Sequence, residues 1–387
     1  MKNNNDILIV GAGPVGLTLA CFLAKYGLKV NIIDKRVEAL SIPKAINISH
    51  STLRIFEKLS GDCDFLSRGM KLSELTVYWE KKRLININYK SSKDKYPYFY
   101  HLEQIYVEKY LNNLLKKYEC GVNRGITLVD LQNKDNQVDV ITRSKDGSYH
   151  NDTYKYVIGC DGGNSAVREQ LNISCEMKDY SAYFILVDAV VTSKLISKIY
   201  YYVNKDGYLI IAPLSENKFR FIFSFPGAYP GHDNIQINIT RIQHLINERA
   251  LEDITLSEIL WSTSARFYHK LAEQAQKENV FLAGDALHQF SPVGGTNMNH
   301  GIQDAYSLAQ KLILINKYEC DASLLNLYHS ERMHAVKINL HNTEIITALL
   351  TRIAKLSDKE KQFLPTMKNR CFIKHGLPNL ITSNTPI

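Results

Sequence analysis

The segment from residue 7 to residue 34 constrains the fold more than any other part of the chain. Two apolar runs, residues 7–10 and 30–33, flank a helical stretch that opens on GAGPVG at 11–16, and Asp34 follows the second run. This order of strand, glycine turn, helix, strand and acid is typical of a parallel βαβ unit whose glycines approach a pyrophosphate and whose acid holds a ribose hydroxyl. The segment therefore predicts a site for an adenine dinucleotide. A glycine turn that binds nothing is the alternative.

A second strand-to-helix junction spans residues 280–312. The apolar run 280–283 stops at Gly284 and Asp285, a glycine-bearing loop follows, and apolar residues recur at helical spacing from residue 302 onward. The first amides of such a helix have no internal partner and favour negative charge or a carbonyl oxygen. A carboxylate at the strand end suits a ribose- or ribitol-type hydroxyl. The alternative is a buried strand, a turn and a core helix without a ligand.

A third apolar run, residues 156–159, ends close to Asp161 and Gly162. Three predicted strands therefore stop at small residues and an acid. Because ligands of open α/β sheets bind outside the carboxyl ends of the strands, this pattern predicts one ligand stretched across one sheet edge. Taken alone, CDGGNSAVR at 160–168 is a glycine-rich turn with a capping serine.

The character of the chain changes between residues 180 and 265. Several β-branched and aromatic runs are separated by turns, which predicts an inserted antiparallel sheet rather than further βαβ units. The phenylalanines at 219, 221, 223 and 225 share one face of a strand. Core packing and the aromatic wall of a substrate pocket both explain them. Residues 323–356 have a helical pattern.

Composition narrows the class of protein. The net charge is +8, from 47 basic and 39 acidic residues, but no basic block stands out, so we expect no nucleic-acid partner. Seven scattered cysteines without a CxxC pair favour reduced thiols and argue against a zinc site, and we expect no metal. We expect no signal peptide, and no apolar run approaches the length needed to span a bilayer. We expect a soluble, cytoplasmic protein.

Three signatures in fixed order carry a family resemblance: GAGPVG with Asp34, CDGGNSAVR at 160–168, and GDALHQFSPVGGTNMN at 284–299. Together they resemble the single-component (class A) flavin monooxygenases, the aromatic-hydroxylase family that includes 4-hydroxybenzoate hydroxylase. The resemblance implies an α/β fold: a Rossmann-type FAD-binding domain with an inserted antiparallel β-sheet substrate domain and a C-terminal helical segment. The length of the chain is similar to that of the compact members, so we expect no C-terminal thioredoxin-like domain.

The resemblance also implies a division of the chain. Residues 1–75, 100–179 and 266–335 would form a discontinuous FAD-binding domain. Residues 76–99 and 180–265 would form the substrate-binding β-sheet domain, and residues 336–387 the C-terminal helices and tail.

The chemistry implied is that of a hydroxylase with bound FAD and transient NADPH or NADH. The family reacts reduced flavin with O2 and hydroxylates an aromatic small molecule, here a phenolic or polyketide-like ring, through a flavin C4a-hydroperoxide. The protein would be a monomer or homodimer. A reductase or saturase on the same fold and a non-enzymatic flavin-binding protein are the alternatives.

Site residues follow position by position from the family motifs. Gln104 would lie near the ribityl chain, the basic residues Lys35 and Lys44 can reach a phosphate or lie in a solvated loop, and Asp161, Gly162 and Arg168 would serve both the pyrophosphate region and the nicotinamide. The residues expected at the cofactor are Gly11, Ala12, Gly13, Pro14, Val15, Gly16, Asp34, Lys35, Lys44, Gln104, Asp161, Gly162, Arg168, Gly284, Asp285, Pro292, Gly294, Gly295, Thr296, Asn297, Met298 and Asn299.

The sequence departs from the family pattern at two places. Lys44 replaces an arginine and loses the bidentate fork on a phosphate. Thr296 and Asn297 replace Gln-Gly, and we expect Asn297 to tolerate a left-handed backbone there.

The substrate side of the site is expected on the inserted sheet. In the hydroxybenzoate branch an arginine on the inserted sheet grips the substrate carboxylate. The equivalent strand here, residues 208–214, has no arginine. Arg220 is nearby in the sequence, but the sequence alone does not place it in the pocket. This favours a larger phenol or polyketide-like ring over a simple benzoate. The residues expected near it are Tyr200, Tyr202, Tyr208, Phe221 and Phe223.

Overall fold

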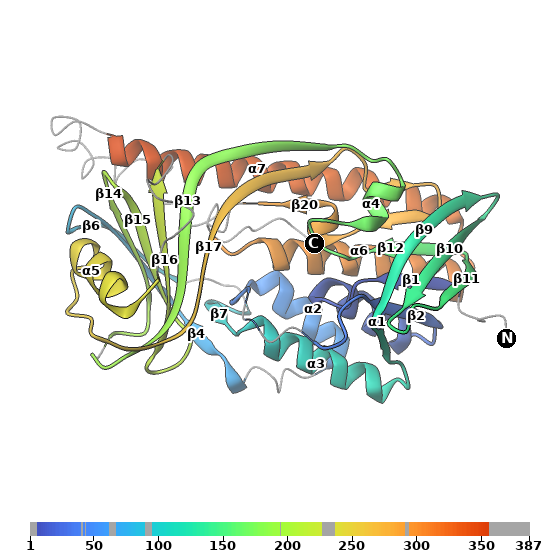
Figure 1. The fold of residues 1–387 in the computed structure, drawn as a ribbon, viewed down its shortest axis with the longest axis horizontal. Helices are drawn as coiled ribbons and strands as arrows, with labels where there is room; N and C mark the ends of the chain where they lie inside the picture. The colour runs from blue at the N-terminus through green and yellow to red at the C-terminus, as the bar shows by residue number, and fades with distance from the viewer. Residues whose placement is uncertain are drawn as a thin grey trace.

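A computed structural model describes residues 6–39, 42, 44–61, 67–89, 95–193, 195–226, 237–290 and 294–355 of the 387-residue chain. It has two parts, joined by two long strands (Figure 1). The first part contains the glycine motifs, and the second is dominated by antiparallel sheet.

The first part is built on a six-stranded sheet in the order β18-β19-β12-β1-β2-β8. All neighbouring pairs are parallel except β18 with β19. The apolar runs become strands buried on both faces, as expected for a parallel sheet with covered faces. The strands are β1 (Ile7–Val10), β2 (Val30–Asp34), β8 (Val122–Arg124), β12 (Tyr156–Gly159), β18 (Gln276–Lys277) and β19 (Val280–Leu282).

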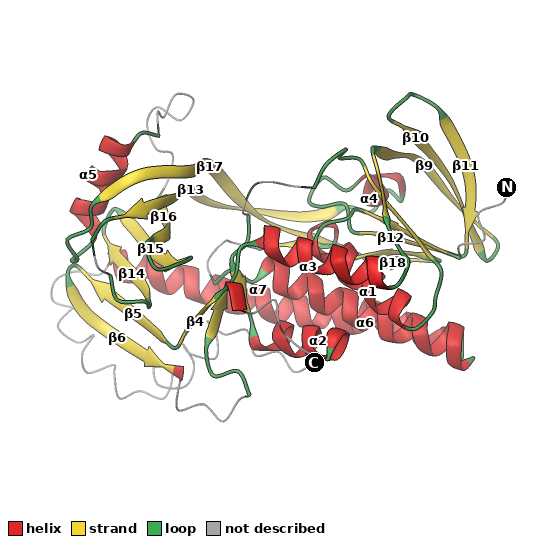
Figure 2. Ribbon diagram, turned by 90° about the horizontal axis from the view of Figure 1, so that it is seen from below, coloured by secondary structure: helices red, strands yellow, loops and turns green. Residues whose placement is uncertain are grey.

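Helices pack side by side on this part (Figure 2). Helix α1 contacts both α3 and α6, and α2 contacts α6. A three-stranded sheet, β11-β10-β9, contributes Leu128, Leu131, Val138 and Val140 to the same core. These elements are α1 (Pro14–Lys25), α2 (His50–Ser60), α3 (Gln104–Lys117), α4 (Ala166–Gln170), α6 (Asn297–Tyr318), β9 (Ile126–Lys134), β10 (Gln137–Ser144) and β11 (Tyr149–Tyr154).

The second part is an eight-stranded sheet in the order β20-β17-β13-β16-β15-β14-β5-β6. Every neighbouring pair is antiparallel except β14 with β5. The predicted inserted antiparallel sheet is therefore confirmed. Its strands are β5 (Glu74–Trp79), β6 (Lys82–Asn88), β13 (Cys175–Val191), β14 (Ile199–Asn204), β15 (Gly207–Pro213), β16 (Lys218–Pro226), β17 (Leu256–Ala272) and β20 (His288–Gln289).

The two faces of this sheet pack on different partners. One face carries the phenylalanines at 219, 221, 223 and 225 and packs on Ile242, Leu245 and Ile246 of α5 (Ile239–Arg249). The other face carries Phe184, Leu186, Tyr208, Ile210 and Ile222 and packs with Leu72 and Phe99. Those two residues belong to a small sheet, β3-β7-β4, formed by β3 (Asn47–Ile48), β7 (Phe99–His101) and β4 (Met70–Leu72). Ile48 and Tyr100 of this small sheet lie in the core of the first part, so the second face looks toward the first part.

Strands β13 and β17 connect the two parts. Each has 17 residues, and they pair from Cys175 with Ala272 to Val191 with Leu256, with three register shifts. The predicted domain boundaries near residues 180 and 265 fall inside these two strands, and β5 begins at Glu74, close to the predicted boundary at 76. The domain division remains a proposal, because paired strands run through both parts.

The helical pattern predicted over 323–356 is confirmed as a 3-10 turn, η5 (Ala322–Leu325), and a long helix, α7 (Asn326–Lys355). Helix α7 runs along both parts (Figure 1) and contacts β14, β15 and β18. The predicted boundary at 335/336 lies inside α7, and residues 356–387 lie outside the described residues. Among the helices that the structure describes, none carries an apolar stretch long enough to cross a lipid bilayer.

Candidate functional site: a dinucleotide edge facing an apolar sheet

Three glycine- and acid-bearing strand ends, at residues 10–16, 159–163 and 282–285, meet at one edge of the parallel sheet, which we call the dinucleotide edge. Backbone hydrogen bonds join them: Gly11 N donates to Ile33 O at 2.8 Å, Cys160 N to Val10 O at 2.7 Å, and Ala283 N to Gly159 O at 3.0 Å. The predicted convergence of the strand ends is therefore present, because the strands run parallel and in register.

The three glycines of GAGPVG have different surroundings. Gly11 has φ +106°, and a Cβ there would lie 2.4 Å from the Cys160 carbonyl oxygen. A Cβ on Gly16 would lie 2.0 Å from the Gly11 carbonyl oxygen, so this glycine allows helix and strand to approach. A Cβ on Gly13 would meet nothing within 4 Å. Gly13 therefore borders open space at the start of α1.

The N-terminus of α1 is free of side-chain caps. Gly13 is the N-cap, no side-chain cap is formed among the described residues, and the first turn contains no acid. Free amides at a helix N-terminus bind phosphate groups, and the helix dipole adds to the attraction. The open space beside Gly13 together with this bare helix start fits the diphosphate of FAD.

Asp34 is already engaged by protein donors. Its Oδ2 accepts from Ala12 N and Arg36 Nη2, both at 2.9 Å, and its Oδ1 accepts from the backbone and Nε of Arg36. Burial alone would raise the pKa of Asp34, but the bonds from Arg36 outweigh it and hold the pKa below its usual value. A ribose hydroxyl would have to share Asp34 with Arg36. Lys35 is exposed.

Asp161 and Arg168 hold the neighbouring loops in place. Asp161 accepts from Ser165 Oγ at 2.5 Å and from Val167 N at 3.2 Å, at the start of α4. The buried Arg168 donates to the carbonyls of Ala286 and Gly163, both at 2.9 Å. It therefore ties α4 to the turn that carries Asp285. Direct cofactor contacts by Asp161, Gly162 and Arg168 remain predictions.

Asp285 lies in a 3-10 turn, η4 (Gly284–Ala286), at the end of β19. Among the residues that the structure describes, its carboxylate has one hydrogen-bond partner, Gln289 Nε2 at 3.3 Å. Burial raises the pKa of Asp285, and the Gln289 bond and the charges of His288 and Lys44 oppose this rise. The carboxylate is thus available to a hydroxyl donor, as the sequence predicts for a ribityl chain.

A buried charge cluster lies beneath this turn. Asp304 of α6 is fully buried and accepts from Gly284 N at 2.9 Å, His288 Nε2 at 2.7 Å and Arg332 Nε at 2.6 Å. Burial alone would raise the pKa of Asp304, but His288 and Arg332 bring it to about 2. Sequence reasoning missed this cluster; the signal was the one acidic residue of α6, directly before the apolar Ala305.

The loop before α6 differs from its prediction at one position. Gly294 and Gly295 adopt left-handed backbones, with φ +84° and +61°. Asn297 is the first residue of α6 and its backbone is not left-handed, so the tolerance expected of an asparagine is not used here. Its side chain instead accepts from Phe290 N at 2.7 Å and donates to Phe290 O at 3.0 Å, which closes the loop. Pro292 lies outside the described residues.

Asn299 links the start of α6 to the start of α2. Its Oδ1 accepts from Ser49 N and Thr52 Oγ1, both at 2.8 Å. Its Nδ2 donates to Asn47 O at 3.0 Å and Gly295 O at 2.9 Å. The Asn299 side chain therefore shapes the loop. Thr296 and Met298 beside it are buried, and Thr296 makes no side-chain cap on α6, so the first amides of this helix remain available to a carbonyl-bearing ring.

The segment at Lys44 and Ala45 is held by Gln104 of the first part and by Arg220 of the second. Gln104 Oε1 accepts from Ala45 N at 3.2 Å, and its Nε2 donates to Glu108 at 2.8 Å. Lys44 is exposed, and its carbonyl accepts from Arg220 at 2.6 Å. Gln104 therefore lies at the start of α3, as predicted, and orders the segment that leads to β3.

The predicted substrate residues divide between the two sheet faces. Tyr200, Tyr202, Phe221 and Phe223 lie in the cluster that packs on α5. Tyr208 lies on the opposite face, against Phe184, with ring centroids 6.1 Å apart. The structure therefore brings Tyr208, but not the other four, to the face that looks toward the strand ends. Those four residues pack as core.

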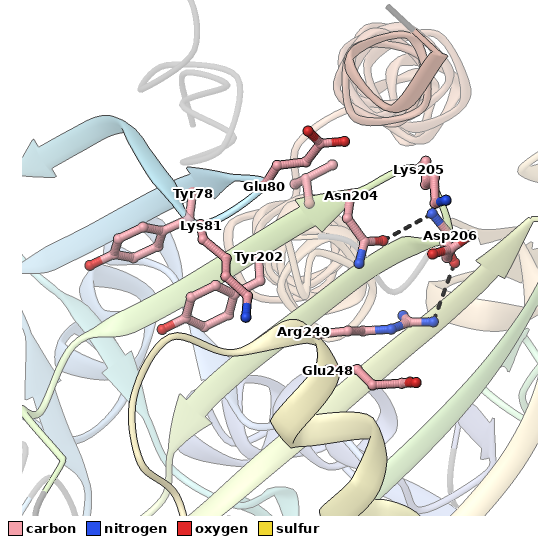
Figure 3. Close-up of a pocket in the computed structure, with 10 residues that line it drawn as sticks. Tyr78, Glu80, Lys81, Tyr202, Asn204, Lys205, Asp206, Glu248 and Arg249 are labelled. Atoms are coloured by element: carbon pink, nitrogen blue, oxygen red, sulfur yellow. Dashed lines mark hydrogen bonds between the residues drawn. The ribbon is translucent and has the colours of Figure 1, made fainter.

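A cavity of about 260 Å³ opens beside the α5 end of the sheet (Figure 3). Tyr78 and Tyr202 stack at one side of it, with centroids 4.9 Å apart. Arg249 donates to the Asp206 carbonyl at the other side. Its lining residues are Tyr78, Glu80, Lys81, Tyr202, Val203, Asn204, Lys205, Asp206, Glu248 and Arg249. None of them belongs to the dinucleotide edge, so this cavity is separate from the site described above.

Comparison with known proteins identifies a family model that matches the chain and several relatives with similar sequences. A family model described as an FAD binding domain matches residues 4–343. Pentachlorophenol 4-monooxygenase of Sphingobium chlorophenolicum is 29% identical over 350 residues, covering 89% of this chain and 64% of that protein. The 6-methylpretetramide 4-monooxygenase of Streptomyces rimosus is 28% identical over 350 residues, covering 89% of this chain and 62% of that protein. The chain thus spans less than two thirds of the length of these two relatives.

The solved structure of p-nitrophenol 4-monooxygenase from Pseudomonas putida DLL-E4 has the same fold, with a TM-score of 0.84 over 100% of both chains at 19% identity. The motif resemblance is confirmed for fold and family. With the family model matched over residues 4–343, the chain belongs to the FAD binding domain family.

Proposed function

We propose that the protein is an FAD-dependent monooxygenase that uses NADPH or NADH and O2 to hydroxylate a phenolic or polyketide-like aromatic ring. The observation that carries this proposal is the meeting of three strand ends at one edge, with open space at Gly13 and a weakly paired Asp285. The names of the two relatives, which act on pentachlorophenol and 6-methylpretetramide, support an aromatic substrate.

The chain's own residues would bind and orient the cofactor. The first amides of α1 would hold the diphosphate, and Asp285 would accept from a ribityl hydroxyl. The loop at Gly294 and Gly295 and the start of α6 would face the carbonyl edge of the flavin ring. When bound, FAD supplies hydride acceptance from the nicotinamide and oxygen transfer to the substrate.

The sheet face that carries Tyr208 would cover the reacting ring. Its described side chains are mainly apolar. Such a cover excludes water and strengthens electrostatic contacts at the reacting centre. We further infer a cytoplasmic location, which the free cysteines among the described residues support, and a monomer or homodimer.

The test is the visible spectrum of the purified protein, followed by NADPH and NADH oxidation in air with a panel of phenols and polycyclic phenols. The proposal predicts a bound flavin spectrum and oxidation that an aromatic compound stimulates. Bound flavin that reduces a substrate without consuming O2 would indicate a reductase or saturase. Bound flavin without NAD(P)H oxidation would indicate a binding protein, and the absence of flavin binding would refute the site itself.

A further inference from the structure

One ion pair interrupts the apolar face of the sheet that looks toward the dinucleotide edge. Asp188 of β13 and Arg220 of β16 are register partners across the two strands. Their side chains are each 2% exposed. Arg220 is the arginine on the inserted sheet that the sequence alone could not place.

The guanidinium of Arg220 pairs with the carboxylate of Asp188 through two hydrogen bonds. Its Nε donates to Asp188 Oδ1 at 2.6 Å and its Nη2 to Asp188 Oδ2 at 2.8 Å. Nη1 donates to the Lys44 carbonyl at 2.6 Å, and the guanidinium lies 5.2 Å from the centroid of the Trp261 ring. Bidentate pairing is the geometry with which arginine binds a carboxylate ligand. Asp188 therefore occupies the position that a substrate carboxylate would need.

This pair is close to the loops expected around the flavin ring. The Lys44 carbonyl that Arg220 binds is three residues before Asn47, whose Nδ2 donates to Gly294 O at 3.0 Å. His101, which hydrogen-bonds Pro213 O at 3.0 Å, is the neighbouring titratable group. Burial lowers the pKa of His101 to about 4, so it carries no charge at neutral pH. Lys44 is exposed, and its charge acts on Asp285.

We propose that Asp188 sets the substrate class of the site: by neutralising Arg220, it makes the site select an aromatic ring without a carboxylate. This inference rests on the proposed monooxygenase function. A carboxylate brought against this apolar face would lose its water without gaining a free cation, which disfavours its binding. An uncharged phenol loses far less hydration at the same place.

The test compares matched ligands that differ only in this charge: 4-hydroxybenzoate and its methyl ester, and a hydroxynaphthoate and its methyl ester. Dissociation constants are measured on the FAD-loaded protein from the change in its flavin absorption spectrum. In the wild type we expect each ester to bind at least about ten-fold more tightly than its acid. Asp188→Asn removes the carboxylate that pairs with Arg220. In this variant we expect the ratio of the dissociation constant of the acid to that of its ester to fall at least about ten-fold.

Two further variants keep the test decisive. The double variant Asp188→Leu with Arg220→Met removes both charges and should retain the wild-type preference for the esters, even if Asp188→Asn does not fold. Glu176→Gln removes an exposed acid from the same strand and should leave the ratio unchanged.

A wild type that oxidises NAD(P)H but binds the acids more tightly would overturn the inference alone. So would a folded Asp188→Asn with the wild-type ratio, or a double variant that prefers the acids. A wild type that oxidises no NAD(P)H with any phenol would instead refute the proposed function.

Discussion

Asp304 is the residue whose removal should affect the stability of the dinucleotide edge most. It is fully buried and serves three donors at once: Gly284 N, His288 and Arg332. In Asp304→Asn, the amide keeps one accepting oxygen, and its NH2 group faces His288 or Arg332, which are also donors. Breaking a buried ion pair by removing one partner costs about 3–5 kcal/mol, so we expect a loss of about 3 kcal/mol in the free energy of unfolding at neutral pH.

The same residue predicts a pH dependence. The folded pKa of Asp304 is about 2, below the ordinary value of 3.8. Its contribution, about 2–3 kcal/mol by linkage, is therefore complete above the unfolded pKa and is lost as the pH falls from near 4 toward 2. The wild type should lose this part of its stability on acidification, whereas Asp304→Asn should not. The gap between the two proteins should narrow as the pH falls.

Urea denaturation of both proteins at neutral pH and at several acidic pH values measures this gap. Glu331→Gln is a matched control, because Glu331 also joins α7 to α6, through Lys311, but is half-exposed. It should cost less than about 1 kcal/mol. A variant Asp304→Asn within about 0.5 kcal/mol of the wild type, or a gap that does not change with pH, would refute the reasoning.

Three further predictions concern the same edge. Gly13→Val places a side chain in open space, so it should leave the melting temperature nearly unchanged. The same variant should weaken FAD binding at least about 100-fold, as measured by fluorescence titration. Gly11→Ala, whose Cβ would lie 2.4 Å from a carbonyl oxygen, should instead destabilise the fold itself. Asp285→Asn should stabilise the FAD-free protein at a pH above the pKa of Asp285 in the folded protein, because burial raises that pKa and disfavours the charged form. Calorimetry should show weaker FAD binding by this variant. A variant that binds FAD as the wild type does would exclude Asp285 from the site. Asn297→Ala should lose about 1–2 kcal/mol in denaturant unfolding, because both of its bonds to Phe290 disappear.

Local patterns predicted the dinucleotide edge well. The three glycines of the first motif, the strand ends at Asp34 and Asp285, and the helix starting at Gln104 all depend on residues within one turn or strand. Their geometry follows from short-range sterics and apolar periodicity, which a sequence shows directly. The same is true of the antiparallel strands of the second part.

Contacts between residues that lie far apart in the chain could not be predicted from the sequence alone. The alternation at 219–225 showed that the phenylalanines share a face, but only the packing of α5 decides that this face points away from the dinucleotide edge. The partners of Asp304 come from β20, the strand-end turn and α7. Asp188 is 32 residues from Arg220. Sequence periodicity sets the side of a strand, not what covers it.

The measurement that tests the central claim most directly is the mass of the product formed from a phenolic substrate, NAD(P)H and isotopically labelled dioxygen by the FAD-loaded protein. The account predicts that the aromatic product carries one labelled oxygen atom for each turnover that forms it. A product with no labelled oxygen, formed by protein that binds FAD and oxidises NAD(P)H, would contradict the assignment as a monooxygenase.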